Sequence, residues 1–160
     1  MMKMTNDEYT RGWLREAQRA LFDARQAAAS ERFVAQSQSA QQCVEYCAKS
    51  VIACFSAPVW THFPGGQLRE IISQNESGIR DRFEERMLKQ LNTLAAEADA
   101  AGPWHGRSTY GIVEQGVVQS WPTELCTEEV AQWLLELANR SFTTAGDFIN
   151  GWFGQNSNEV

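Results

Sequence analysis

The sequence contains no uninterrupted apolar run near the roughly 20 residues that a membrane-spanning helix requires. Residues 1–8, MMKMTNDE, lack the apolar core of a secretion signal. Only four cysteines occur, at positions 43, 47, 54 and 126, and no two of them form a CxxC pair. A chain of this length can bury a core without disulfides. We therefore expect a soluble, single-domain, cytoplasmic protein with reduced thiols and no membrane contact.

Several catalytic motifs are also missing. The sequence has no glycine-rich loop that cradles phosphates, no HExxH pair and no GxSxG elbow. These absences argue against a conventional nucleotide-hydrolysing or hydrolase site. We expect no cofactor and no bound metal ion, and a role that is not enzymatic is favoured.

Basic charge is scarce in the last third of the chain. The net charge is −6, and residues 110–160 carry Arg140 as their single base against seven acids. The first 109 residues hold 13 basic and 13 acidic residues and are therefore neutral overall. Net acidity argues against avid, non-specific binding of polyanions but is compatible with a local basic site. Most of the bases are arginines, which suit bidentate contacts.

Apolar residues at alternating spacings of three and four predict long amphipathic helices, such as the one whose face carries Ala17, Leu21 and Ala24. The expected helices cover about residues 7–29, 33–55, 67–73 and 77–100, followed by a last helix capped by Thr127. We expect an irregular connection over 103–126 and no strands. The predicted fold is all-α, an up-and-down bundle of four to five helices in one domain (1–153) with a frayed tail (154–160).

Three stretches carry patterns of a known family. Residues 13–24, WLREAQRALFDA, are similar to an opening WL-x-x-A-x-x-D-L-x-x-A helix. Residues 39–50, SAQQCVEYCAKS, resemble a core helix of the form A-Q-Q-A-x-E-x-x-x-K-A, with Cys43 and Ser50 in place of alanines. His62 ahead of Leu68 is similar to an H-x-L signature. These patterns resemble the HEPN family (higher eukaryotes and prokaryotes nucleotide-binding domain), and the predicted fold is then HEPN-like.

Two later segments look like those of stand-alone prokaryotic HEPN proteins. Residues 107–111, RSTYG, resemble a stretched R-Y-P segment, and residues 127–131 resemble the start of the final helix. The resemblance implies a dimer, and it implies a small nucleotidyltransferase partner of the kind found in toxin–antitoxin pairs. It also implies that active members cut RNA without metal through Arg-x(4–6)-His. Neither His62 nor His105 follows an arginine at that distance, so we assign no catalytic residue.

The candidate binding residues lie in two connections. His105, Arg107 and Tyr110 combine an imidazole, a guanidinium that can fork onto phosphate and a phenol, and Trp104 offers a stacking face for a base. His62 joins them if both connections lie at one end of the bundle. The alternative is structural: Trp104 and Tyr110 pack the connection onto the bundle, Arg107 caps a helix end, and His62 is a capping or partly buried histidine.

Two further groups have functional and structural interpretations. The arginines at positions 11, 15, 19 and 25 share one arc of the first helix and either meet RNA or an acidic partner or form a solvated surface. Cys43 and Cys47 either bind a metal with His62 or Cys126 or are buried thiols on an apolar stripe. The solvated surface and the buried thiols are the favoured interpretations.

The leading hypothesis is a helical binding protein that forms a homodimer and engages a nucleotide, RNA or a partner nucleotidyltransferase. One alternative is a diverged, metal-independent ribonuclease toxin whose base is His105 or His62, and another is a helical scaffold with no small ligand. The dimer prediction rests on the aromatic content, six tryptophans and eight phenylalanines. Several of these aromatics fall in or near the last helix: Trp121, Trp133, Phe142, Phe148, Trp152 and Phe153.

Overall fold

The computed structural model describes residues 6–154, so the expected tail lies outside the described residues beyond Gly154. This part of the chain forms eight helices and two strands: α1 (Asn6–Ala29), α2 (Phe33–Ala53), α3 (Gly65–Gln74), α4 (Glu76–Arg82), α5 (Glu85–Ala101), α6 (Trp104–Thr109), β1 (Ile112–Glu114), β2 (Val117–Ser120), α7 (Pro122–Leu125) and α8 (Glu128–Phe153). Within it, none of the helices has the length and apolarity to cross a membrane.

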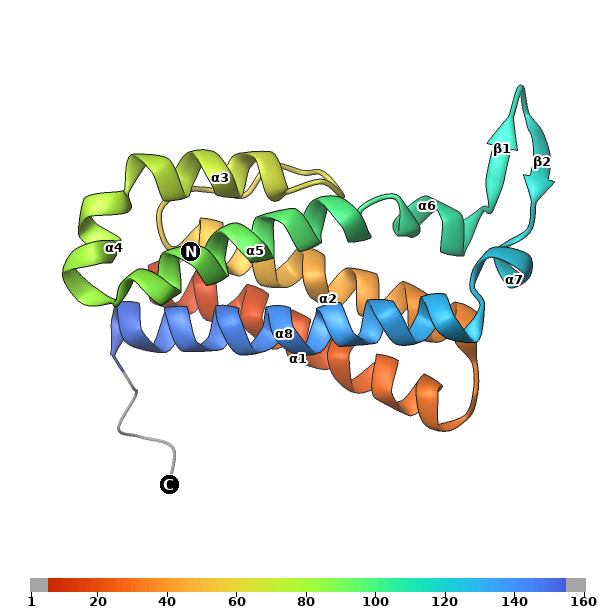
Figure 1. Cartoon of the computed structure of the whole chain (residues 1–160), viewed down its shortest axis with the longest axis horizontal. Coiled ribbons are helices and arrows are strands. Elements are labelled where there is room, and N and C mark those ends of the chain that lie inside the picture. Colours follow the sequence, from red (N-terminus) through yellow and green to blue (C-terminus); the bar gives the residue numbers. More distant parts are fainter. Residues whose placement is uncertain (1–5, 155–160) are drawn as a thin grey trace, which may run out of the picture.

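The four longest helices alternate in direction, as Figure 1 shows. Helices α1 and α5 run one way along the long axis of the molecule, and α2 and α8 run the other way. Helix α2 contacts α1, α8, α5, α3 and α6, so it is the centre of the bundle, while α3 packs along α5. The predicted all-α, up-and-down architecture is confirmed.

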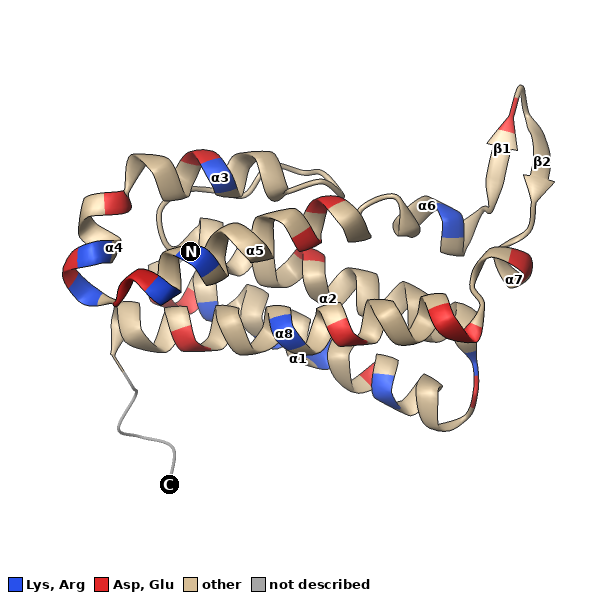
Figure 2. Cartoon of the chain, in the orientation of Figure 1, with Lys and Arg blue, Asp and Glu red and all other residues tan. Residues whose placement is uncertain are grey.

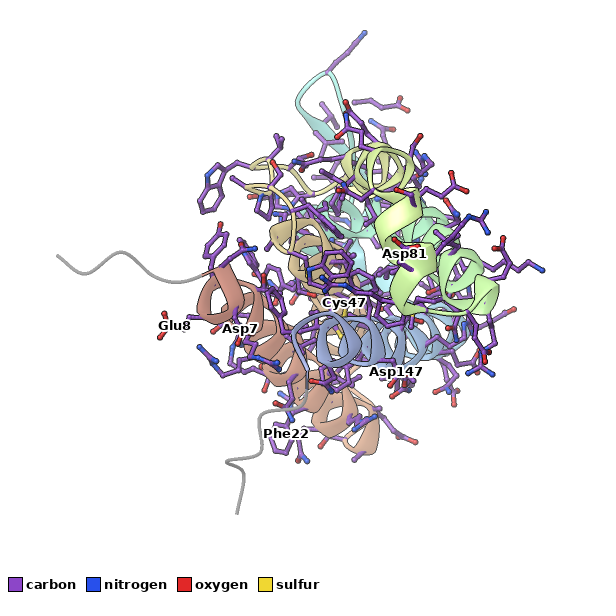
Figure 3. All side chains as sticks on the ribbon, turned by 90° about the vertical axis from the view of Figure 1, so that its left-hand side faces the viewer. Asp7, Glu8, Phe22, Cys47, Asp81 and Asp147 are labelled. Carbon is purple, nitrogen blue, oxygen red and sulfur yellow. The ribbon has the colours of Figure 1, made fainter. Side chains whose placement is uncertain are left out.

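The predicted apolar faces form the core. Ala17, Leu21 and Ala24 of α1 are buried, and so are Leu134 and Phe148 of α8. Figure 3 shows Cys47 in the interior of the molecule and the acidic side chains that it labels on the outside. Phe22 is also labelled there, and it is 61% exposed because it falls off the apolar stripe of α1.

The single helix predicted over 77–100 is wrong in one respect, because the chain leaves helical geometry at Phe83 and Glu84. Both residues have extended backbone angles, so α4 ends and α5 begins a new axis. The extended backbone lets the Phe83 ring stack on Phe148, with ring centroids 5.1 Å apart. Gly151 provides the room, since a Cβ there would collide with the Phe83 ring. Tertiary packing overrides the helical periodicity at this point.

The irregular connection expected over 103–126 is also wrong, since it contains α6, a β-hairpin and α7. The two strands are antiparallel and joined through Gln115 and Gly116, whose φ angles are 50° and 76°. Positive φ at both central residues is typical of a type I′ hairpin turn, which Gly favours and Gln disfavours. Figure 1 shows the hairpin projecting from one end of the bundle.

Candidate functional site

The loop between α2 and α3, residues 54–64, reaches the junction of α5 and α6 (Figure 1). Gly102 makes this close approach feasible. A Cβ on Gly102 would lie 2.5 Å from Cδ1 of Phe63 and 3.1 Å from the carbonyl oxygen of His62. Because Gly102 has no side chain, the loop packs directly against the segment that leads into α6, and His62 lies beside His105.

The two imidazole rings stack face to face. The ring centroids of His62 and His105 are 3.5 Å apart, and the ring planes differ by 14°. The side chain of His62 is half exposed, and His105 is partly buried. The chain has two histidines, so this pair contains every imidazole of the protein.

A buried carboxylate lies beneath the histidine pair. Glu45 of α2 is 5% exposed. Its Oε1 accepts a hydrogen bond from Nζ of Lys49 at 2.7 Å, and its Oε2 accepts one from Nε2 of Gln41 at 3.0 Å. Nδ1 of His62 lies 3.1 Å from the same Oε2. Gln41, Glu45 and Lys49 are spaced by four residues, so one face of α2 presents all three side chains.

The contacts around Glu45 keep it ionised. Burial by itself raises the pKa of this carboxyl group, but hydrogen bonds from Lys49 and Gln41, the charge of Lys49 and the contact with His62 outweigh that effect and leave the pKa below its ordinary value. An ionised carboxylate only accepts hydrogen bonds, so Nδ1 of His62 carries the proton in this contact. Glu45 therefore fixes both the orientation and the tautomer of His62.

His105 is biased towards its neutral form. Partial burial and the adjacent His62 lower the pKa of His105, and the more distant Glu45 opposes this only in part. Like charges on the two stacked rings would repel each other, which is why the adjacent His62 lowers the pKa of His105. In its neutral form His105 offers a ring nitrogen with a free lone pair.

Lys49 connects the buried carboxylate to the first helix. Its Nζ lies 5.4 Å from the ring centroid of Trp13, a cation–π contact. The Trp13 ring also packs on Tyr46, with centroids 5.6 Å apart. The tryptophan of the 13–24 segment and the glutamate and lysine of the 39–50 segment therefore form one buried polar cluster.

Exposed aromatic side chains lie on the two segments that carry the histidines. Trp60 and Phe63 in the 54–64 loop are 90% and 54% exposed, and Tyr110 at the end of α6 is 67% exposed. Arg107 lies over the Trp104 ring, with its guanidinium carbon 5.2 Å from the ring centroid. We call these residues, together with His62 and His105, the α6 end.

The structure brings the predicted site residues together only in part. His62 and His105 are in direct contact, and Arg107 contacts Trp104. The Trp104 ring meets Trp133 of α8 edge-on, with centroids 6.5 Å apart, so it also packs the connection onto the bundle. Tyr110 projects from the end of α6 into solvent. Which of these side chains bind a ligand stays a prediction.

Sequence reasoning missed Gln41, Glu45 and Lys49 as site residues, although they lie in the segment that carries the resemblance. A signal for them was present. Polar side chains four residues apart on the central helix of a bundle must either reach solvent or satisfy one another. Here Glu45 and Lys49 satisfy each other inside the protein.

A second recess lies between α5 and α8, away from the α6 end. Its volume is about 430 Å³, and its basic lining residues are Arg86, Lys89 and Arg140. Arg140 is already paired with Glu97, whose side chain is 9% exposed, at a distance of 2.9 Å. Within residues 6–154, Arg86 and Lys89 of α5 form no ion pair, which makes the recess a competing candidate for an anion.

The other two groups weighed from sequence have local partners. Arg19 pairs with Glu16 and Asp23 on the same helix, both at 3.1 Å. Figure 2 likewise shows basic residues interleaved with acidic ones along α3 and α4. Cys43 and Cys47 are fully buried with their sulfur atoms 4.0 Å apart, and burial raises the pKa of the Cys47 thiol well above its ordinary value. A protonated, buried thiol is a poor metal ligand.

The described residues form a helical domain whose central helix carries a buried Glu45–Lys49 ion pair. The model of the HEPN domain matches residues 10–147, most of the chain. The protein belongs to the HEPN domain family. Neither a curated protein nor a solved structure matched the chain.

Proposed function

We propose that this HEPN protein binds single-stranded RNA, or a nucleotide as its minimal unit, at the α6 end. The observation that supports this proposal is the exposure of Trp60, Phe63 and Tyr110 on the two segments that also carry His62 and His105. Exposed aromatic rings give bases a stacking surface, and stacking contributes about 1–3 kcal/mol per base. Buried aromatics would stabilise the bundle more than exposed ones do, so their exposure favours a ligand.

Arg107 supplies the phosphate contact in this proposal. Its guanidinium lies over Trp104, which fixes the plane of the side chain without neutralising its charge. A fixed guanidinium can donate two parallel hydrogen bonds to a phosphate. The net charge of −6 makes long-range attraction weak, so binding depends on these short-range contacts.

Fluorescence anisotropy with a short fluorescein-labelled single-stranded RNA of mixed sequence, in EDTA, tests this function. Arg107→Ala is expected to weaken binding about 10- to 100-fold, because a hydrogen bond to a charged group contributes roughly 1.5–3 kcal/mol. Arg107→Lys is also expected to weaken binding, because the ammonium lacks the planar fork. The effect is expected to be smaller than that of Arg107→Ala, because the positive charge is kept. Tyr110→Ala is expected to lower affinity as well, through the loss of stacking.

The recess between α5 and α8 provides the matched control. Arg86→Ala and Lys89→Ala each remove one exposed cation, as Arg107→Ala does, but away from the α6 end. Under the proposal they leave affinity within about twofold. If they weaken binding and Arg107→Ala does not, the RNA lies in the recess. A lower melting temperature for Arg107→Ala with unchanged affinity would assign Arg107 a structural role.

A second candidate function is RNA cleavage without metal by a diverged active site. The observation in its favour is the Glu45–His62 contact, in which a buried carboxylate orients an imidazole that stacks on a second imidazole. Such a pair can take a proton from a 2′-hydroxyl and give one to the leaving oxygen. A cleavage assay in EDTA with His62→Ala and His105→Ala tests it, and activity that both variants retain would refute it.

We also propose that the protein acts as a cytoplasmic homodimer and pairs with a nucleotidyltransferase in a toxin–antitoxin system. The family membership supports this assembly. Co-expression of the two proteins followed by size-exclusion chromatography tests it, and separate elution of the nucleotidyltransferase would contradict the pairing. A protein that binds neither RNA nor this partner would instead be a helical scaffold.

A further inference from the structure

We propose that Glu45, His62 and His105 form a binding site for a divalent transition-metal ion of the zinc type. One carboxylate and two imidazoles come from three separate segments: α2, the 54–64 loop and α6. The ligand atoms that they offer all lie within 4.8 Å of one another. The site shares the α6 end with the proposed RNA contacts, but it does not depend on Arg107 or Tyr110.

Two of the three ligands are already spaced for coordination. Nδ1 of His62 and Oε2 of Glu45 lie 3.1 Å apart. Two ligands that each lie about 2.0–2.1 Å from zinc are themselves about 3 Å apart when they subtend close to a right angle. The ion would therefore take the place of the Nδ1 proton of His62, and that proton would move to Nε2 as the ring changes tautomer.

His105 closes the site by a ring movement. The spread of 4.8 Å among the ligand atoms exceeds the separation in a finished site, and the two rings are nearly parallel. For two imidazoles to aim lone pairs at one ion, the angle between the two ring planes must increase from 14°. His105 is partly buried on a short helix, and His62 is half exposed on a loop, so both rings have room to turn.

The surroundings of Glu45 support a ligand role. A carboxylate has about four lone-pair sites, and Lys49 and Gln41 occupy one on each oxygen. They hold the group in place as outer-shell partners do in metal sites. The Lys49 ammonium lies on Oε1, so the ion approaches Oε2, and the nearby positive charge limits the affinity.

The ligand set selects the class of metal. Imidazole with carboxylate suits Zn²⁺, Co²⁺, Ni²⁺ and Fe²⁺ better than Mg²⁺ or Ca²⁺, which prefer oxygen ligands alone. His62 is exposed, so the three protein ligands leave at least one position open to water or to a ligand atom.

Isothermal titration calorimetry with ZnCl₂, in several buffers that differ in ionisation enthalpy, tests the site on the full chain. We expect one ion per protein and a heat that depends little on the buffer, because the Nδ1 proton of His62 stays on the ring at Nε2. His62→Ala, His105→Ala and Glu45→Gln are each expected to weaken binding by about 10- to 100-fold or more. Glu45→Gln keeps the side-chain shape, and the two histidine variants lie at the surface, so the fold can be verified by circular dichroism.

Cysteine is the competing zinc ligand in this chain, and Cys126→Ser and Cys43→Ser are the matched controls. Both are expected to retain zinc binding, since these thiols are buried and are not part of the group formed by Glu45, His62 and His105. Unchanged affinity in the His62→Ala/His105→Ala double variant would overturn the proposal, as would the absence of any binding by the parent protein.

Nitrogen-15 NMR of the imidazoles gives a second readout. Both histidine spin systems are expected to shift on addition of Zn²⁺, and their ring-current shifts are expected to fall as the stack opens. Mg²⁺ is expected to leave both unchanged.

Bound zinc would occupy the lone pairs that metal-independent cleavage needs, so added zinc would inhibit such cleavage. RNA binding is measured in EDTA, so failure of either proposal leaves the other standing.

Discussion

Nδ1 of His62 contacts Oε2 of Glu45, a residue 17 positions earlier on α2, at 3.1 Å. This contact joins an exposed loop to the most enclosed helix of the bundle. The loop itself carries exposed aromatic residues, but its position is set by a buried charge.

Removal of Lys49 is expected to destabilise the fold strongly. Its ammonium and the Glu45 carboxylate are 5% and 6% exposed, so Lys49→Ala leaves a buried negative charge without its main partner. The expected loss is about 3–5 kcal/mol in the free energy of unfolding, measured by urea denaturation. As a control, Arg19→Ala breaks an exposed pair and is expected to cost less than about 1 kcal/mol. A small loss for Lys49→Ala would show that Glu45 gains a proton or reaches water.

Stability is expected to fall as the solution is acidified. The pKa of His105 is lower in the folded protein than its ordinary value of 6.5, so the unfolded chain binds a proton more readily. The contribution of His105 to the free energy of unfolding is therefore fully present above about pH 6.5, and it is lost as the pH falls through the folded-state pKa. Thermal melts across this range check the slope, which is expected to flatten in His105→Gln. An unchanged slope in that variant would assign it to other groups.

Gly102→Ala is expected to disturb the histidine pair. The new methyl group would press on the Phe63 ring and the His62 carbonyl and push the loop away from α6. We expect a loss of about 1–3 kcal/mol in stability and a weaker zinc affinity. Gly106→Ala is the matched control, because a Cβ there meets nothing within 4 Å and α6 gains a better helix former. If the two variants behave alike, the close packing at Gly102 does not position His62.

The predicted homodimer is supported by fewer exposed aromatic residues than the sequence suggested, because some of them are buried within one chain. Phe148 is fully buried within one chain, and its ring packs on Trp152 at 5.7 Å. Trp121 and Trp133 remain 60% and 37% exposed. Light scattering at micromolar concentration is expected to report a dimer, and Trp133→Ser is expected to weaken it. A monomer at that concentration would contradict the prediction.

Helical periodicity predicted most of the fold, because a helix with one apolar stripe must bury that stripe against the core. The last helix begins after Thr127, whose hydroxyl oxygen accepts a hydrogen bond from the Val130 amide at 3.2 Å, as its sequence position predicts. The break at Phe83 was not predictable. No glycine or proline marks it, and its cause is a ring 65 residues further along the chain, Phe148.

The site was harder to predict than the fold, because its members meet only through tertiary packing. His62 and His105 lie 43 residues apart, and their contact depends on Gly102, which the sequence presents only as a helix stop. The hairpin was missed for a local reason. Its turn is Gln115-Gly116 instead of the Asn-Gly or Asp-Gly pair that marks such turns in a sequence.

The break at Phe83 also bears on where this domain ends. Arg82 donates a hydrogen bond to the carbonyl oxygen of Trp152 at 2.7 Å and lies over its ring at 4.0 Å, just before Phe83 enters the cluster beside Gly151. The family match ends at residue 147, ahead of both partners. A chain cut at that point would strip α4 of its anchor and expose the Phe83 ring. We therefore predict that the smallest unit that folds as described includes Trp152, because the last turns of α8 hold α4 in place, a helix seventy residues earlier in the chain.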